Sequence, residues 1–384
     1  MSNISFGKKI SYYIFIFIAL VILTNLKFAF PFFTQQLYYG LILLILMLNL
    51  FQFKIRYLNP LAILLIITTA LSLLANNTPS FFQAESRWLA WLLIFIVFGP
   101  FMINSGFEFF RKKSFEWVIK ICEIVGVGSF FWYLLGLPNL GRGSFSGLTY
   151  HSMLLGPLAG IGFVSILHRL IYGKFKNKIW MFACLVLLLI TMLLSASRTA
   201  LVACVFASLV SLYIRYKGKI ILVLGFIGLL AVLSFTFLGK TGKFTKSLEN
   251  KGSGNSREFY WRDRISEFKS NPIFGNGFAT LKIGNKGVGD DGGVEPGTSW
   301  LAILSMTGIV GLLSFCLLVL GIYFKLLKRV LKNKDIKMSL YLCVISFFLV
   351  SFISEGYVYA SGSMLAMVFW LTMGGAMDQS RSFS

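Results

Sequence analysis

Charged side chains are scarce in this sequence. They make up 13% of its 384 residues, whereas 57% are hydrophobic, and a soluble globular domain is about a quarter charged. Uncharged apolar runs recur along the whole chain, and many approach the length of about 20 residues that a helix needs to cross a bilayer. The composition therefore excludes a soluble domain and predicts an all-α, polytopic membrane protein.

Cysteine is also rare, and its placement excludes two kinds of site. The five cysteines all lie inside apolar runs: Cys122, Cys184, Cys204, Cys316 and Cys343. None stands in a polar loop, so the sequence supports neither a disulfide framework nor a cysteine metal site. We expect free thiols that pack as small hydrophobic groups, and we expect no metal ion and no other cofactor.

Acidic residues are few as well. The chain has 14 Asp and Glu against 36 Lys and Arg, for a net charge of +22. The basic residues do not form one patch, because they recur in the short segments between apolar runs. That distribution is typical of the cytoplasmic loops of membrane proteins. The charge therefore indicates orientation in the membrane, and we expect no nucleic-acid partner.

The apolar runs predict about twelve membrane-spanning helices. Their expected ranges are 10–33, 36–53, 60–75, 88–104, 115–137, 150–170, 179–195, 198–214, 219–238, 298–324, 338–354 and 362–377. If the N-terminus is cytoplasmic, every short inner segment carries Lys or Arg, whereas the short outer segments carry only Arg87, Arg142 and Arg198. The first run is too long for a signal-peptide core, so we interpret it as a retained helix. Both termini are predicted to be cytoplasmic.

One long polar segment interrupts this pattern late in the chain. Residues 239–297 form a predicted outer loop between residues 1–238, with nine helices, and residues 298–384, with three. No internal repeat divides the chain into related halves.

The loop contains the stretch NSREFYWRDRISEFKSNPIFGNGF, residues 255–278. Asn255 and Glu258 resemble a capping box, and Pro272 ends a helix at about residue 270. At about 100° per residue, one face of this helix holds a set of aromatic and basic residues. That face comprises Arg257, Trp261, Arg264 and Phe268, flanked by Tyr260 and Ile265. The pattern fits an amphipathic helix at lipid headgroup depth, and it equally fits arginine forks that bind a diphosphate beside aromatic rings.

Four motifs occur in order around this helix. They are GRGSFSGLTYHSMLLGPLAG from residue 141, SASRTALVACVFASL from residue 195, NPIFGNG at 271–277 and TGIVG at 307–311. Together they resemble the O-antigen ligase and polymerase superfamily of bacterial envelope glycosyltransferases.

The resemblance implies a GT-C type enzyme of the inner membrane that acts on the periplasmic side. Such an enzyme transfers a glycan from undecaprenyl diphosphate to an acceptor hydroxyl, with inversion and without a metal ion. By the family pattern, Arg198 and Arg257 hold the donor diphosphate. The implied partners are the lipid-linked glycan, membrane lipids and a chain-length regulator protein. Further candidates for substrate binding are Arg142, Tyr260, Trp261, Arg262 and Arg264.

The sequence departs from the family at the general base. Ligases of the family carry a histidine–asparagine pair where this chain has Gly297 and Thr298. Glu295 and His151 are the remaining candidates for accepting the proton, and a good leaving group can also make a strong base unnecessary. His168 lies at the opposite end of its predicted span, and we interpret it as structural.

The missing histidine favours a polymerase, which joins lipid-linked repeat units, over a ligase that transfers glycan to lipid A core. A glycan flippase is a third hypothesis, although transporters often show related halves and ionisable residues in mid-membrane. A metal-dependent oligosaccharyltransferase needs acids in its first outer loop, and here that loop is only about Thr34–Gln35.

Overall fold

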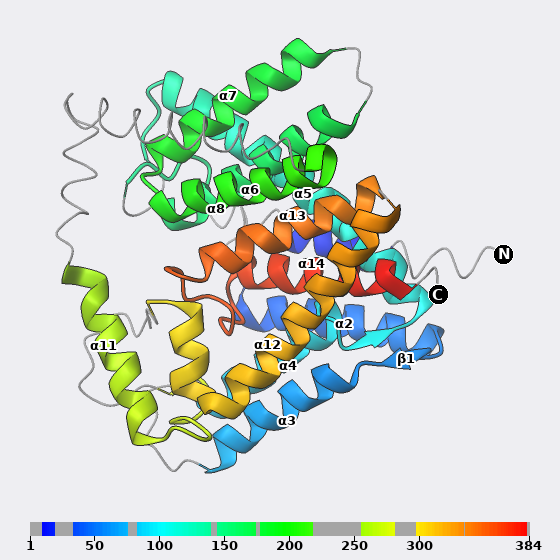
Figure 1. The fold of residues 1–384 in the computed structure, drawn as a ribbon, viewed down its shortest axis with the longest axis vertical. Coiled ribbons are helices and arrows are strands. Elements are labelled where there is room, and N and C mark those ends of the chain that lie inside the picture. The colour runs from blue at the N-terminus through cyan, green and yellow to red at the C-terminus, as the bar shows by residue number, and fades with distance from the viewer. Residues whose placement is uncertain are drawn as a thin grey trace.

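The fold is a bundle of helices, shown in Figure 1 for a computed structural model. The structure describes residues 10–19, 34–75, 83–139, 144–173, 177–217, 255–280, 297–333 and 335–381. Its first helix is Ile10–Ala19. The labelled helices are α2 (Gln35–Gln52), α3 (Pro60–Ala75), α4 (Ala84–Phe98), α5 (Ser105–Leu134), α6 (Ser152–Tyr172), α7 (Lys178–Leu194), α8 (Arg198–Tyr216), α11 (Asn255–Ser270), α12 (Ser299–Asn333), α13 (Ile336–Ser351) and α14 (Met364–Arg381). Two short strands, β1 (Tyr57–Leu58) and β2 (Met102–Ile103), pair antiparallel.

Several of these helices have the length and composition of membrane spans. Among the described residues, four are long and apolar enough to cross a bilayer, namely α5, α6, α8 and α12. Shorter apolar helices accompany them at Ile10–Ala19, Gln36–Phe51, Pro60–Ala75, Lys178–Leu194 and Ile336–Ser351. The protein is thus an all-helical, multi-pass membrane protein. The full set of twelve spans stays a prediction, because residues 20–33 and 218–254 lie outside the described residues.

Antiparallel packing gives the bundle two distinct ends. The Ser72 hydroxyl of α3 donates to the Met306 carbonyl of α12 at 2.6 Å, while Thr68 and Ser314 share a hydrogen bond of 2.9 Å. The end of α3 therefore lies beside the beginning of α12. We call this side, where α11 also lies, the loop end, and the opposite side the basic end.

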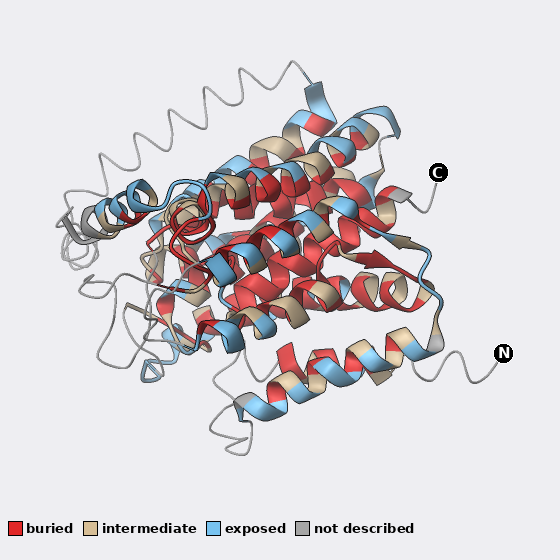
Figure 2. Cartoon of the chain, turned by 90° about the horizontal axis from the view of Figure 1, so that it is seen from below, coloured by how far each residue is buried: buried red, intermediate tan, exposed pale blue. Residues whose placement is uncertain are grey.

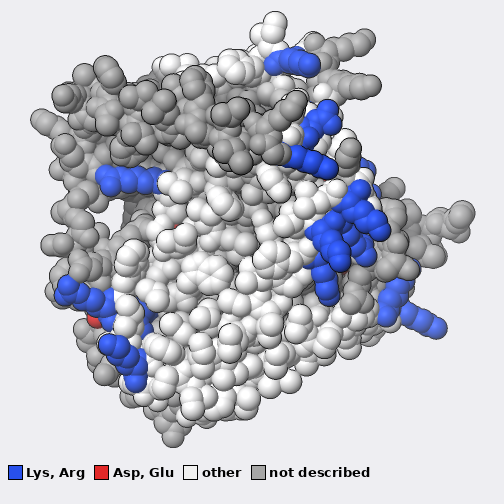
Figure 3. All heavy atoms as spheres, in the orientation of Figure 1, with Lys and Arg blue, Asp and Glu red and all other residues white. Residues whose placement is uncertain are grey.

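Charge separates along the same direction. In Figure 3, Lys and Arg side chains gather at opposite edges of the molecule, most of them on the right, and a wide band of uncharged atoms lies between them. Figure 2 shows buried residues along the facing sides of the helices. An uncharged outer band around a packed interior is the arrangement expected of a bundle in a bilayer.

Some helices extend beyond the predicted spans. The predicted span 115–137 corresponds to α5, which begins ten residues earlier at Ser105, where the Asn104 side chain accepts a hydrogen bond of 2.7 Å from the Phe107 amide. In the opposite sense, α4 ends at Phe98, before Gly99 and Pro100, although its predicted span runs to residue 104. Hydropathy detects the apolar part of a helix, whereas caps and prolines determine where the helix begins and ends.

Candidate functional site

The two glycine-rich motifs that follow α11 form one structural unit. The α12 helix is interrupted at Gly308, whose φ is 66° and ψ −168°, and the segment 271–277 lies in this break. The Asn276 amide donates to the Ser305 carbonyl at 2.9 Å, and the Ile309 amide donates to the Pro272 carbonyl at 2.9 Å. Backbone groups that α12 leaves without partners at the kink are thus satisfied by the turn after α11.

The glycines of this unit are required by close backbone contact. A Cβ added to Gly308 would lie 2.1 Å from the Ile273 carbonyl oxygen, and one added to Gly275 would lie 2.4 Å from the Met306 carbonyl. Both residues also have positive φ, at 66° and 71°, which side-chain-bearing residues rarely adopt. The motif NPIFGNG therefore fixes the position of α11 against α12.

The α11 helix itself has the predicted limits, from Asn255 to Ser270. Figure 1 shows it at the edge of the bundle, beside the beginning of α12. Its buried side holds Arg264 and Glu267, each 1% exposed, which form an ion pair of 2.8 Å. Burial lowers the pKa of the Arg264 guanidinium, and the Glu267 carboxylate opposes that shift.

This burial differs from the predicted face. We predicted that Arg257, Trp261, Arg264 and Phe268 share one apolar face. In the structure Arg264 and Glu267 lie on the buried side of α11, whereas Trp261, which was predicted to share the face of Arg264, is 39% exposed. Periodicity could not reveal this, because an arginine with an acidic partner in the next turn can be buried in place of an aromatic ring. Arg262 is exposed, and Arg257 lies on the first turns of α11, where the structure describes the backbone only.

Gly297 lies directly against α11. It is buried, with φ of 75°, and an added Cβ would lie 2.7 Å from Cβ of Tyr260 and 3.7 Å from Cδ1 of Trp261. This is the position at which the resembling family carries histidine. A histidine at this position would therefore clash with Tyr260 and lie against Trp261. The packing of α11 is consistent with the glycine that this chain has in place of the family's histidine.

The beginning of α12 is held by the segment that follows α13. The Ser299 amide donates to the carbonyls of Phe352 and Glu355, at 3.1 and 3.0 Å, and the Ser299 hydroxyl donates to the Glu355 carbonyl at 2.6 Å. The Thr298 hydroxyl donates to the Phe352 carbonyl at 2.8 Å. The backbone of Glu355, a half-buried residue, thereby contacts Ser299, which is two residues after the position that lacks the expected histidine.

Sequence reasoning missed Glu355. It stands in a short segment between two predicted spans and belongs to none of the motifs. The available signal was that Glu355 is an acidic residue in a predicted short outer segment, a part of this chain in which acidic residues are scarce.

Arg198 begins α8 at the same end and is exposed. The next residue, Thr199, forms a hydrogen bond with Ser354, the neighbour of Glu355. On its other side, an added Cβ at Gly156 of α6 would lie 2.4 Å from Cβ of Ser197. The segments that carry Arg198 and Glu355 are therefore in direct contact.

His151 is the N-cap of α6, one turn before Gly156. Its Nδ1 accepts a hydrogen bond of 3.0 Å from the Met153 amide. In the neutral ring that geometry leaves the hydrogen on Nε2, so the imidazole presents a donor rather than an acceptor. Of the other predicted site residues, Arg142 and Glu295 lie outside the described residues.

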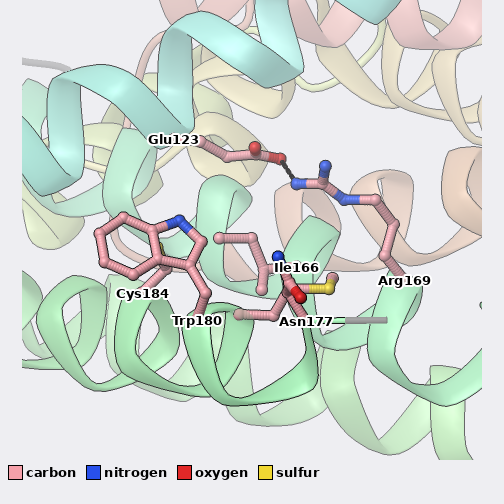
Figure 4. Close-up of a pocket in the computed structure, with 7 residues that line it drawn as sticks. Glu123, Ile166, Arg169, Asn177, Trp180 and Cys184 are labelled. Carbon is pink, nitrogen blue, oxygen red and sulfur yellow. Dashed lines mark ion pairs between the residues drawn. The ribbon is translucent and has the colours of Figure 1, made fainter. Parts of the chain in front are cut away.

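The structure has cavities at both ends of the bundle. The one in Figure 4 lies at the basic end, has a volume of about 380 Å³, and is bounded by α5, α6 and α7. There Glu123 forms an ion pair with Arg169, above Trp180 and Cys184, and it accepts a hydrogen bond of 2.7 Å from Ser165. Because this cavity is at the opposite end from the motifs, we assign it to packing.

The other cavity, of about 980 Å³, lies at the loop end between α2, α4, the beginning of α12 and residues 356–363. Within the part of the chain that the structure describes, no group of three or more His, Cys, Asp or Glu side chains could hold a metal ion.

A comparison with protein families identifies part of the chain. Residues 183–316 match the family model described as O-antigen ligase. No curated protein matches the chain significantly. The matched range runs from α7 to the middle of α12, and it contains Arg198, the whole of α11 and the kink at Gly308.

Proposed function

We propose that this chain, whose residues 183–316 match the O-antigen ligase family of glycan-transferring membrane enzymes, is a polysaccharide polymerase of the GT-C type. It takes a glycan from undecaprenyl diphosphate and transfers it to the non-reducing-end hydroxyl of another lipid-linked repeat unit. The reaction inverts the anomeric carbon and uses no metal ion. The loop end faces the periplasm of a bacterial inner membrane, and a chain-length regulator is a candidate partner.

The chemistry needs fixed positive charge at the leaving group. The bond between the anomeric carbon and the diphosphate oxygen breaks, and its electron pair stays on the diphosphate. The acceptor oxygen attacks the opposite face of the sugar, forms the new glycosidic bond and loses its proton. Arginine suits the leaving group because its guanidinium stays charged and binds two phosphate oxygens at once.

One observation carries this proposal. Four segments far apart in the sequence meet at the loop end: the beginning of α8 with Arg198, the α11 residues Tyr260 and Trp261, the beginning of α12, and residues 352–355. A lipid diphosphate lies at the membrane surface, where the helices of a bundle begin and end. Arg198 and Arg257 are proposed to hold it, with Arg142, Tyr260, Trp261 and Arg262 around the substrate.

The test replaces each arginine by lysine. In proteoliposomes supplied with lipid-linked repeat units, Arg198→Lys and Arg257→Lys should each lower the elongation rate by about tenfold or more, because lysine cannot form the two-pronged contact. Arg56→Lys, at the basic end and 61% exposed, is the matched control and should elongate normally. Polymer of normal length and rate from both substituted proteins would refute the assignment.

Arg264 is a weaker candidate for substrate contact than its neighbours. It is buried against Glu267, so we propose that it positions α11 rather than touching the glycan.

Three groups are candidates for the acceptor proton. Glu295 and His151 follow from the sequence, and Glu355 follows from its place beside Thr298 and Ser299. His151 is the weakest of the three, because its Nδ1 already accepts a hydrogen bond from the Met153 amide. A general base contributes about 10²–10⁴-fold in rate. The residue whose isosteric replacement (Glu295→Gln, Glu355→Gln or His151→Asn) removes the fall in rate at low pH is the base, because a general base must be deprotonated to act. If all three variants retain the wild-type profile, the proton leaves late without a strong base.

One observation supports the ligase alternative: the matching family model is described as O-antigen ligase. A strain that lacks the protein decides between the two. A polymerase-null strain accumulates single repeat units on the carrier lipid, whereas a ligase-null strain accumulates long chains there. A flippase, the alternative from another class, predicts repeat units that remain on the cytoplasmic side.

A further inference from the structure

The cavity at the loop end has the lining of a carbohydrate site. Its volume of about 980 Å³ is at the upper end of the range for small-molecule pockets. The wall carries an arginine, two amides, hydroxyls and two tyrosine rings, together with alanine, glycine and the larger apolar side chains of Leu89, Leu93, Met306 and Val358. The polar groups are Gln36, Tyr39, Gln83, Ser86, Arg87, Tyr359, Ser361 and Ser363.

Contacts on two sides fix the wall of this cavity. The Tyr39 hydroxyl donates to the Ser361 hydroxyl at 3.0 Å, and the Tyr38 hydroxyl donates to the Ser361 carbonyl at 3.2 Å. Tyr359 packs against Phe278 and Trp91, with ring centroids 5.0 and 5.5 Å apart. The segment that lines the cavity is thereby tied to α2 on one side and to α4 on the other.

Arg87 is placed where it can reach a ligand. It lies in the first turn of α4 and lines the cavity. Its guanidinium is close enough to the Tyr39 hydroxyl for the two groups to interact electrostatically. A cation beside a phenol and two amides offers several donors to sugar hydroxyls or to an acidic sugar.

The cavity is continuous along the chain with the candidate site. Phe352 and Glu355 bind the beginning of α12, and Ser354 contacts Thr199 beside Arg198. The very next residue, Gly356, already lines the cavity, as do Val358 to Ser363. A ligand in the cavity therefore lies against the same segment that contacts the helix of Arg198.

We propose that this cavity binds the acceptor glycan, with Arg87 and the neighbouring amides holding its sugars and its terminal hydroxyl directed toward Glu355. The inference rests on the proposed function and names the second of its two substrates. The donor diphosphate is assigned to Arg198 and Arg257, so both substrates lie near residues 352–363.

The experiment separates acceptor from donor. A repeat-unit glycan, released from carrier lipid that accumulates in a strain lacking the protein, is attached to a short fluorescent alkyl chain. Without a diphosphate this probe accepts sugar and cannot donate it. Full-length protein in nanodiscs then elongates the probe with lipid-linked repeat units as donor.

Two variants alter the cavity in different ways. Arg87→Ala removes the cation, and Ala90→Trp fills space at a lining position of α4. Each should raise KM for the probe by about tenfold, while KM for the donor changes by less than about twofold. Arg56→Ala and Leu135→Trp are the controls, since Leu135 is 73% exposed at the end of α5, away from the cavity wall.

Thiol labelling gives a readout that does not depend on turnover. Ala360→Cys, at an exposed lining position, should react with a maleimide and be protected by the probe, whereas Leu135→Cys should react equally with and without it.

The outcomes separate the two proposals. A wild-type protein that elongates nothing overturns the proposed function and this inference with it. An active wild type, with probe KM unchanged in both variants and no protection of Ala360→Cys, overturns the acceptor site alone.

Discussion

Gly297 and Tyr260 are in contact across the beginning of α12: a Cβ added to the glycine would lie 2.7 Å from Cβ of the tyrosine. The contact joins α11, which the family match contains entirely, to the residue at which the resembling ligases carry histidine. A packed glycine therefore stands at that position, and a catalytic base must be supplied by another residue. Glu355 is supplied by the segment that binds the next two residues.

We expect Gly297→Ala to lower both stability and activity. The substitution introduces the 2.7 Å contact and places a side chain at φ of 75°, where left-handed backbone alone costs about 1–2 kcal/mol. Gly297→His should be worse, although it restores the family residue. Thermal unfolding in detergent and elongation in proteoliposomes measure the effects. Gly40→Ala, which meets nothing within 4 Å, is the control, and equal behaviour of the two alanine variants would contradict the contact.

A substitution at the kink of α12 should have a more severe effect on folding. In Gly308→Ala the new Cβ would lie 2.1 Å from the Ile273 carbonyl oxygen, and neither backbone can move without losing the hydrogen bond from Ile309 to Pro272. We expect the yield of folded protein to fall sharply. Gly321→Ala, in the same helix and with its nearest neighbour at 3.8 Å, should be produced normally. A normal yield of Gly308→Ala, measured by size-exclusion chromatography, would show that α11 does not bind α12 in this way.

Neighbouring arginines of α11 should behave differently. Arg264→Ala leaves Glu267 buried without its partner, a change that typically costs about 3–5 kcal/mol, so its melting temperature should drop. Arg262 is exposed, and Arg262→Ala should retain the melting temperature while it lowers the elongation rate. Glu267→Gln with Arg264→Met should recover much of the lost stability. If Arg262→Ala proves the less stable variant, the orientation of α11 is incorrect.

A second buried ion pair holds the basic end. Arg111 of α5 and Asp378 of α14 are 3.1 Å apart and almost fully buried, and Arg111 also donates to the Met102 carbonyl at 2.9 Å. Asp378→Asn should destabilise the protein by about 3–5 kcal/mol, because a charge stays buried without compensation. Glu108→Gln breaks the exposed pair with Arg56 and should cost less than about 1 kcal/mol. Chemical unfolding of both variants makes the comparison.

Much of the fold was predictable from local patterns. The apolar runs predicted most of the described helices, and the capping residues with Pro272 predicted α11 from Asn255 to Ser270. The order of the motifs pointed to the family that residues 183–316 match. These features are local because a helix is defined by residues within a few turns of each other.

The sequence by itself determined the class of the protein, its membrane character and the residues of α11, because composition, helical period and motif order act over short distances. Only the tertiary structure decided that Arg264 is buried against Glu267, that Tyr260 lies against Gly297, and that the backbone of Glu355 binds the beginning of α12. Tyr260 and Gly297, like Glu355 and Ser299, are separated by tens of residues, and Arg264 and Glu267, although only three residues apart, are buried by the packing of α11 on the bundle. The sequence carries no period or spacing for such contacts, since packing in three dimensions selects them.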